Sequence, residues 1–278
     1  MRVQFPRKTI DLSTPCVMGV LNVTPDSFSD GGCFNRLDAA LRQVEKMVSE
    51  GAVFIDVGGE STRPGAAPVS ESDELDRVCP VVEAVCREFD VVVSLDTSTA
   101  SVMREGVRLG AGLINDVRAL ERPGAVEAAI EAGVPVCVMH MRGTPQTMQD
   151  DPRYKDPVQE VKDYLMGRVE SLVLQGVERE RIILDPGFGF GKTLEHNLRL
   201  LDQIEGFVDL GFPVLAGISR KSMLGMITGK DVDQRLPASL SAAALAVYNG
   251  AHIIRAHDVA ATVDAVKVAV AVRKSRDL

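Results

Sequence analysis

Short apolar runs alternate with longer amphipathic segments along almost the whole chain. Each run has the length of a buried β-strand and is followed by polar or turn residues. The predicted strands cover residues 17–21, 53–57, 91–95, 113–115, 136–139, 182–184, 214–217 and 252–255. Segments between them carry apolar residues at i, i+3, i+4 and i+7, which is the spacing of an amphipathic helix. The predicted helices cover residues 37–50, 71–89, 158–175, 238–249 and 259–274.

This alternation predicts an α/β fold, a single-domain (β/α)₈ TIM barrel over residues 1–278. Residues 1–15 are a candidate hairpin that caps the bottom of the barrel. A doubly wound open sheet is the competing architecture. Two features favour the barrel. No G-x-G-x-x-G follows the first strand, and polar residues end nearly every strand instead of gathering at one crevice. No Pro/Ser-rich linker divides the chain.

Charge and cysteine content narrow the class of protein. The net charge is −8 with no basic run, which argues against a nucleic-acid partner. The N-terminus lacks a signal-peptide core, and no apolar run approaches the ~20 residues of a membrane span, so no membrane partner is expected. Five cysteines without a C-x-x-C predict reduced thiols in a cytoplasmic protein.

Active sites of such barrels lie at the carboxyl ends of the strands. Asn22 ends the first predicted strand and shares parity with Met18 and Val20, so its amide oxygen can face a phosphate or Mg²⁺. Thr62 and Arg63 follow the second strand, where a hydroxyl and a forked cation suit phosphate or carboxylate.

Three acceptor side chains end strands in the middle of the chain. Asp96, Asn115 and Asp185 are expected to converge at the barrel mouth, in a pocket suited to a heterocycle with several N–H donors. The alternative for a single strand-end carboxylate is a helix N-cap. After Asp185, glycines alternate with Phe188 and Phe190, which suits either a flat apolar partner or a hydrophobic plug.

The last strands supply hydroxyls and cations. Ser219 and Lys221 stand where a helix should begin, a position suited to an anion or a carbonyl. Arg255 and His257 share parity, and with Arg63 they predict a clamp for a polyanion in an acidic protein. His140 is expected to line the site rather than bind a metal, because no second ligand lies at metal spacing.

The chain resembles the bacterial dihydropteroate synthase family of pterin-binding enzymes along nearly its whole length. The most specific stretches are MGVLNVTPDSFSDGG at 18–32, DVGGESTRPG at 56–65 and DPGFGFGK at 185–192. Shorter matches lie at 94–98, 114–117, 219–222 and 255–258. The first two stretches and DPGFGFGK are highly specific in combination, whereas any one of them alone is weak.

The resemblance implies a homodimeric barrel that condenses 6-hydroxymethyl-7,8-dihydropterin pyrophosphate with 4-aminobenzoate, using Mg²⁺, and that binds sulfonamides. It implies a catalytic set of Asp96, Asp185, Lys221 and Arg255. It implies pterin recognition by Asp96, Asn115 and Asp185, with Lys221 over the ring and Met139 and Gly217 as lining. Asn22 is implied as the metal and pyrophosphate contact. The rest of the diphosphate site is implied to be Thr62, Arg63, Arg255 and His257. The aminobenzoate pocket is implied to comprise Phe28, Pro64, Phe190, Ser219 and Lys221.

The mechanism expected from this resemblance is dissociative substitution. Pyrophosphate leaves, Asp96 and Asp185 stabilise the resulting pterin-methylene cation, and the aniline nitrogen attacks. Three alternatives stay open from the residues. A methyltetrahydrofolate-type methyltransferase would not need the Arg63, Arg255 and His257 clamp, and a catalytically silent paralogue would only bind pterin or a partner protein. A phosphate-sugar isomerase or aldolase would want a catalytic Glu, or a Lys within a strand, and no predicted strand contains one.

Overall fold

Eight parallel strands close into a barrel, which confirms the predicted fold class. The computed structural model describes residues 1–24, 33–60, 69–144 and 147–275. Neighbours in the sheet follow the order β8-β7-β6-β5-β4-β3-β10-β9, and a parallel bridge between Leu184 and Val214 joins the two ends. The strands are β3 (Cys16–Asn22), β4 (Phe54–Gly58), β5 (Val92–Asp96), β6 (Leu113–Asp116), β7 (Val136–Met139), β8 (Ile182–Asp185), β9 (Leu215–Ala216) and β10 (Ile253–Ala256).

The strand boundaries differ from the sequence prediction in one systematic way. β5, β6 and β8 each run one residue further than their apolar patterns and include Asp96, Asp116 and Asp185. A polar side chain ends an apolar run, but its backbone continues the parallel ladder. The prediction was too long at β9, which covers only Leu215–Ala216.

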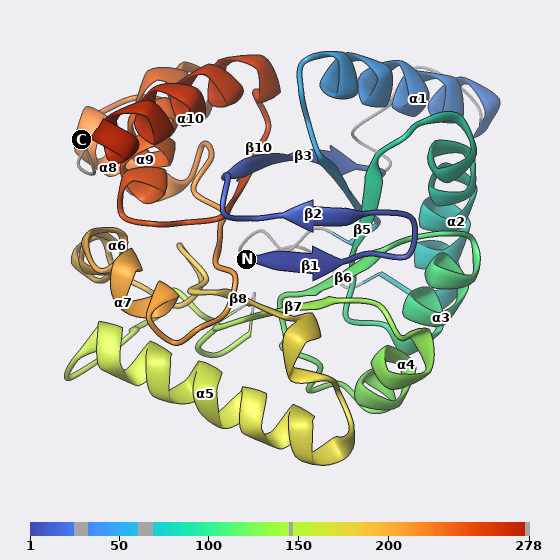
Figure 1. Cartoon of the computed structure of the whole chain (residues 1–278), viewed down its shortest axis with the longest axis horizontal. Helices are drawn as coiled ribbons and strands as arrows, with labels where there is room; N and C mark the ends of the chain where they lie inside the picture. Colours follow the sequence, from blue (N-terminus) through green and yellow to red (C-terminus); the bar gives the residue numbers. More distant parts are fainter. Residues whose placement is uncertain (25–32, 61–68, 145–146, 276–278) are drawn as a thin grey trace.

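An outer ring of helices surrounds the barrel (Figure 1). Its members are α1 (Cys33–Ser49), α2 (Glu71–Glu88), α3 (Ala100–Arg108), α4 (Ala125–Ala132), α5 (Pro157–Gln175), α6 (Leu194–Asp202), α7 (Ile204–Val208), α8 (Ser222–Thr228), α9 (Leu236–Tyr248) and α10 (Val259–Lys274). The apolar spacing did not delimit α3, α4, α6, α7 and α8, although a helix was expected to begin near Ser219 and Lys221, where α8 begins. These helices have five to nine residues, too few turns to repeat an apolar spacing. No helix within the described residues is long and apolar enough to cross a membrane.

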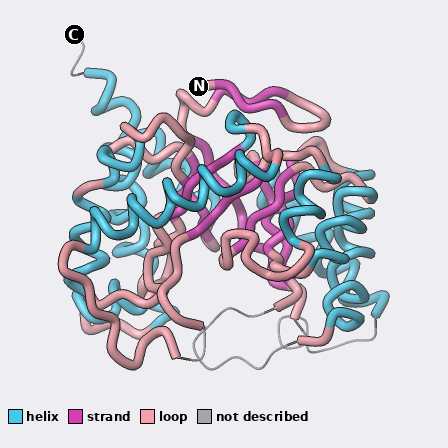
Figure 2. The backbone as a smooth tube through the Cα atoms, turned by 90° about the horizontal axis from the view of Figure 1, so that it is seen from below, coloured by secondary structure: helices cyan, strands magenta, loops and turns pink. Residues whose placement is uncertain are grey.

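A hairpin closes the end of the barrel where the strands begin (Figures 1 and 2). It pairs β1 (Arg2–Gln4) with β2 (Thr9–Asp11) in antiparallel fashion. Its Val3, Phe5 and Leu12 pack on an apolar layer inside the barrel. That layer takes one side chain from each strand: Met18, Phe54, Val92, Leu113, Cys137, Ile183, Leu215 and Ile253. The functional groups must therefore lie further along the strands.

Candidate active site

The barrel interior changes from apolar to polar within two residues along most strands. Because strand side chains alternate between faces, the inward position after the bottom layer lies two residues on. That position is Val20, Asp56, Ser94, Asn115, Met139, Asp185, Gly217 or Arg255, strand by strand. The next inward position places Asn22, Gly58, Asp96 and His257 at the carboxyl end. Asp56, Asp96, Asn115 and Asp185 are all buried, so the site is a polar cluster resting on an apolar floor.

Arg255 joins two carboxylates at the centre of this cluster. Its Nε lies 2.6 Å from Asp56 Oδ2, and a terminal guanidinium nitrogen lies 2.8 Å from Asp96 Oδ2. The Asn115 amide donates to the same Asp56 oxygen at 3.1 Å. Burial opposes the charge of Arg255, but Asp56 and Asp96 outweigh it and raise the Arg255 pKa. Residues from four strands are thus held in one hydrogen-bonded group.

Burial favours the uncharged forms of the groups around Arg255, so it raises the pKa of the carboxyls and lowers the pKa of the lysine. Burial raises the pKa of Asp96 to about 7, although the charge of Arg255 acts against the shift. Burial also raises the pKa of Asp185, against a hydrogen bond from the Gly187 backbone N–H. The pKa of Lys221 is lowered to about 8 by burial, with Asp185 opposing. Strongly perturbed groups gathered at a strand-end cluster are a mark of a functional site.

The loop after β8 folds back against the end of β7. Gly187 has φ +70°, and a Cβ there would lie 2.0 Å from the His140 carbonyl oxygen. Phe188 is fully buried in the core and its carbonyl accepts a hydrogen bond from Lys221 Nζ. The Lys221 ammonium lies 4.3 Å from the centroid of the Phe190 ring. Of the two phenylalanines, Phe188 is therefore the plug and Phe190 faces the site cation.

The remaining predicted residues are distributed around this centre. Met139 is buried, and Gly217 and Asn22 are half-buried. Ser219 Oγ lies 3.0 Å from His257 Nδ1. Arg255 pairs with Asp56 and Asp96, so it lies among the residues predicted to recognise the pterin. A diphosphate clamp formed by Arg255 with Arg63 and His257 stays a prediction. Four predicted residues lie outside the described part of the chain: Phe28, Thr62, Arg63 and Pro64.

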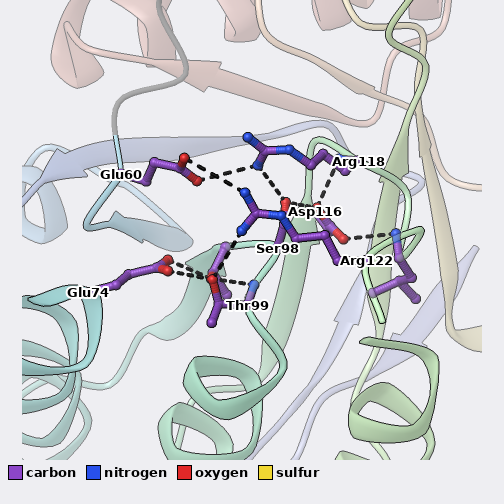
Figure 3. A network of polar contacts seen from close by, with 9 residues as sticks. Glu60, Glu74, Ser98, Thr99, Asp116, Arg118 and Arg122 are labelled. Carbon is purple, nitrogen blue, oxygen red and sulfur yellow. Dashed lines mark hydrogen bonds and ion pairs between the residues drawn. The ribbon is translucent and has the colours of Figure 1, made fainter. Parts of the chain in front are cut away.

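A second polar network joins the exits of β4, β5 and β6 (Figure 3). Arg118 Nη1 lies 3.3 Å from Glu60 Oε2 and 3.0 Å from Ser98 Oγ. Buried Asp116 accepts hydrogen bonds from the Ser98 hydroxyl and from the Arg118 backbone N–H. Arg122 adds a bond to Thr99 at 3.3 Å. The network ties together the segments that follow three neighbouring strands.

Buried Glu74 of α2 anchors the other side of the network. Its two carboxylate oxygens accept hydrogen bonds from the Thr97 and Thr99 hydroxyls, each at 2.6 Å. The two threonines lie one and three positions after Asp96, so Glu74 fixes the backbone that follows this carboxylate. Thr99 is also the residue at the N-cap of α3, where its side chain makes no capping bond. The alternative role for Asp96 as a helix cap is therefore wrong.

Two residues of the site, Asp56 and Lys192, were not expected from the sequence. Asp56 is fully buried and bonded to Arg255, and its parity with Phe54 was the signal that could have identified it. Lys192 is also buried, and its Nζ lies 2.9 Å from His140 Nδ1. No local pattern indicated that pairing, because the two residues are 52 positions apart.

The arrangement combines hydrogen-bond acceptors with cations in a water-poor setting. Asp96 and Asp185 offer carboxylates and Asn115 offers an amide, which suits a heterocycle that presents N–H groups. Lys221 and Arg255 supply positive charge beside them. Within the described residues no group of three or more His, Cys, Asp or Glu could hold a metal ion.

Comparisons with known proteins agree with this chemistry. The pterin binding enzyme family model matches residues 18–257. The chain is 53% identical to the dihydropteroate synthase of Haemophilus influenzae, over 96% of this chain and 98% of that protein. It is 51% identical to the Escherichia coli dihydropteroate synthase, over 97% of this chain and 95% of that protein.

Solved structures resemble the chain over nearly its full length. Yersinia pestis dihydropteroate synthase in complex with a sulfonamide drug superposes with a TM-score of 0.94 at 50% identity, covering 99% of this chain and 100% of that one. The Xanthomonas albilineans dihydropteroate synthase with 4-aminobenzoic acid superposes with a TM-score of 0.92 at 45% identity, with 98% of each chain covered. The same enzyme with 7,8-dihydropteroate superposes with a TM-score of 0.89 at 42% identity, covering 98% of this chain and 99% of that one.

Proposed function

The chain belongs to the pterin binding enzyme family, and from its site we infer that it acts as a dihydropteroate synthase, a transferase. It condenses 6-hydroxymethyl-7,8-dihydropterin pyrophosphate with 4-aminobenzoate to give 7,8-dihydropteroate and pyrophosphate. The observation that carries this conclusion is the buried acceptor set of Asp96, Asn115 and Asp185 beside two cations. Relatives that are 41–53% identical to this chain are named dihydropteroate synthases. Their names do not favour a methyltransferase or a silent paralogue.

We propose that the three acceptors hold the pterin. Asp96, Asn115 and Asp185 accept its N–H groups, Met139 and Gly217 line the ring, and Lys221 lies over it. All of these positions except Lys221, the N-cap of α8, sit on strands or at strand ends, so the ring meets a preorganised surface. Phe190, Ser219 and Lys221 are proposed to contribute to the aminobenzoate pocket with Phe28 and Pro64. Thr62, Arg63, Arg255 and His257 remain the proposed diphosphate contacts.

The proposed mechanism needs no nucleophile–base pair. The bond between the pterin methylene carbon and the diphosphate oxygen breaks, and the electron pair leaves with pyrophosphate. Asp96 and Asp185 lie where their negative charge stabilises the resulting cation in a low-dielectric site. The aniline nitrogen then attacks the methylene carbon and loses a proton.

Magnesium is proposed as the cofactor, with Asn22 as its protein contact. A neutral amide oxygen at the end of β3 fits a hard cation that keeps waters and binds through substrate phosphates. When bound, the ion neutralises charge on the diphosphate. Chelation with EDTA should abolish turnover, and added Mg²⁺ should restore it. Full activity in EDTA, measured by pyrophosphate release, would remove the metal from this proposal.

The perturbed carboxyl and ammonium groups predict a narrow pH optimum. The raised pKa of Asp96 means that its carboxylate form grows as pH rises through about 7. The lowered pKa of Lys221 means that its ammonium form is lost as pH rises through about 8. If both charged forms bind the pterin substrate, kcat/KM should be bell-shaped with limbs near these values. Asp96→Asn should remove the acid limb and Lys221→Arg the alkaline limb. A flat profile across this range would contradict both assignments.

A homodimer is proposed through the face formed by α8, α9 and α10. Met226, Ile227, Val232, Leu245, Val268 and Val272 are each at least 50% exposed. Large apolar side chains gathered on neighbouring elements indicate a protein–protein contact. Leu245→Asp should convert a dimer to a monomer in sedimentation velocity, whereas Leu174→Asp on α5, 88% exposed in the native chain, should leave the dimer intact. A monomeric parent protein would rule this interface out.

We further propose that residues 1–278 form a single domain in the cytoplasm. The hairpin shares an apolar layer with every barrel strand, so it belongs to the same unit. Cys16, Cys79, Cys86 and Cys137 are free thiols, which suits a reducing compartment.

The test of the activity follows both products at once. Purified protein is incubated with the pterin pyrophosphate, 4-aminobenzoate and Mg²⁺ while pyrophosphate and dihydropteroate are measured. Coupled appearance of both supports the function, and sulfonamide competition against 4-aminobenzoate is then expected. Pyrophosphate release alone would mean that the aminobenzoate pocket is assigned wrongly. Pterin binding without either product would favour the silent paralogue.

A further inference from the structure

The loop between β8 and α6 has an unusual hydrogen-bonding pattern. Side chains donate to the backbone carbonyl of every residue from Gly187 to Gly191. Their donors are, in order, Lys192, Lys221, Gln149, Lys192 and Tyr154. A loop whose carbonyls are all held by side chains has one shape rather than several. Lys192 is the donor used twice.

Lys192 is buried at 3% exposure, and its amino group lies among four polar atoms. Its Nζ lies 2.8 Å from the Gly187 oxygen, 3.0 Å from the Phe190 oxygen, 2.9 Å from His140 Nδ1 and 3.3 Å from the His140 carbonyl oxygen. Burial lowers the pKa of Lys192 well below its usual value. Either protonation state of Lys192 can make these contacts, so they join the loop to the end of β7 in both.

His140 follows the last residue of β7 and is the side-chain partner of Lys192. Burial and the Lys192 charge lower the pKa of His140 to about 3, so its ring is neutral. Nδ1 either accepts a hydrogen bond from the Lys192 ammonium or donates one to its neutral amine. The His140 ring is held edge-on against the Tyr164 ring, with centroids 4.9 Å apart. This histidine therefore holds Lys192 in place.

We infer that Lys192 and His140 are positioning residues for the 4-aminobenzoate subsite. The inference rests on the proposed function and adds residues that act through the loop. Lys192 fixes the Phe190 carbonyl, and the Phe190 ring from the same residue lies under the Lys221 ammonium. The pterin acceptors Asp96 and Asn115 are held by a strand ladder instead, and Asp185 lies in the β7–β8 ladder while its carboxylate also accepts a hydrogen bond from the Gly187 N–H at 2.7 Å. Loss of Lys192 should therefore disturb one substrate more than the other.

Four variants of the full chain test this. Lys192→Met and His140→Leu should each raise KM for 4-aminobenzoate about tenfold or more, since each leaves buried polar groups unpaired. KM for the pterin pyrophosphate should stay within about threefold, because strand ends are the rigid part of the site. His140→Asn keeps an acceptor near the position of Nδ1 and should stay within about threefold of the parent for both substrates. Val85→Ala opens a cavity in the distant α2 and should lower Tm without changing either KM.

Hydrogen exchange supplies a readout that does not depend on activity. Lys192→Met and His140→Leu should speed amide exchange across 187–191, where the Gly189 N–H now donates to Asn197 Oδ1 at 2.7 Å. Val85→Ala should not. Equal rises in both KM values, or exchange no faster than in Val85→Ala, would overturn the inference. A parent protein without activity would instead overturn the proposed function, and exchange would then decide whether these residues shape the loop.

Discussion

Gly187→Ala is expected to destabilise the protein by at least ~3 kcal/mol and to lower kcat/KM by at least ~100-fold. The residue has φ +70°, a left-handed conformation that costs an alanine about 1 kcal/mol. The larger cost is steric, because the new Cβ would lie 2.0 Å from the His140 carbonyl oxygen. Relief requires the loop to move away from β7, and this movement displaces the groups that Lys192 and Lys221 hold.

Gly211→Ala is the matched control for this substitution. Gly211 has φ +83°, and an added Cβ there meets no atom within 4 Å. It therefore measures the backbone cost alone. Thermal unfolding and kinetics of both variants separate the two contributions. Equal losses of stability in the two variants would mean that the loop moves away from the His140 carbonyl oxygen at no cost in unfolding free energy.

Arg255→Met is expected to cost about 3–5 kcal/mol of stability at neutral pH, because it leaves buried carboxylates without their cation. Asp56 is fully buried, and its Oδ1 already has no hydrogen-bond partner. Asp96 is nearly as buried and lies 2.8 Å from the guanidinium. Turnover should fall by more than ~100-fold, because a cation aimed at the reacting groups is lost with the fold intact.

The Arg255→Met defect should depend on pH in a defined direction. Burial already raises the pKa of Asp96 to about 7, and removing the cation raises it further. In the variant, stability is highest when Asp96 is protonated, and it is lost as pH rises through the folded-state pKa. The difference in unfolding free energy from the parent should therefore grow as pH rises through about 7 and shrink as pH falls below it. A difference that stays constant on both sides of about pH 7 would contradict this account.

Arg104→Met provides the comparison for an ion pair at the surface. Arg104 lies 2.6 Å from Glu131, but both side chains are largely exposed. Solvent screens such a pair, so its loss should not change Tm measurably. Urea unfolding of the two arginine variants, with the parent protein alongside, tests whether burial rather than pairing sets the size of the effect. A loss as large in Arg104→Met would argue against burial as the cause.

Much of the site follows from local sequence. The alternation of strands and helices predicts the barrel, and strand parity predicts which residues point inward. Asn115, Asp185 and Arg255 each lie two residues after an apolar floor residue, and Asp96 and His257 lie two further positions along their strands. Parity is a property of the extended backbone itself, so it can be read without knowing any partner.

Tertiary structure alone decided which of these side chains meet. Arg255 bonds to Asp56 across 199 positions, because parallel pairing places β10 beside β3 and β3 beside β4. Lys192 meets His140 only because the glycine loop folds back on β7. Local pattern fixes the direction of a side chain but not the distance to a group on another strand. That distance depends on strand register and barrel closure, which form only when the whole sheet has assembled.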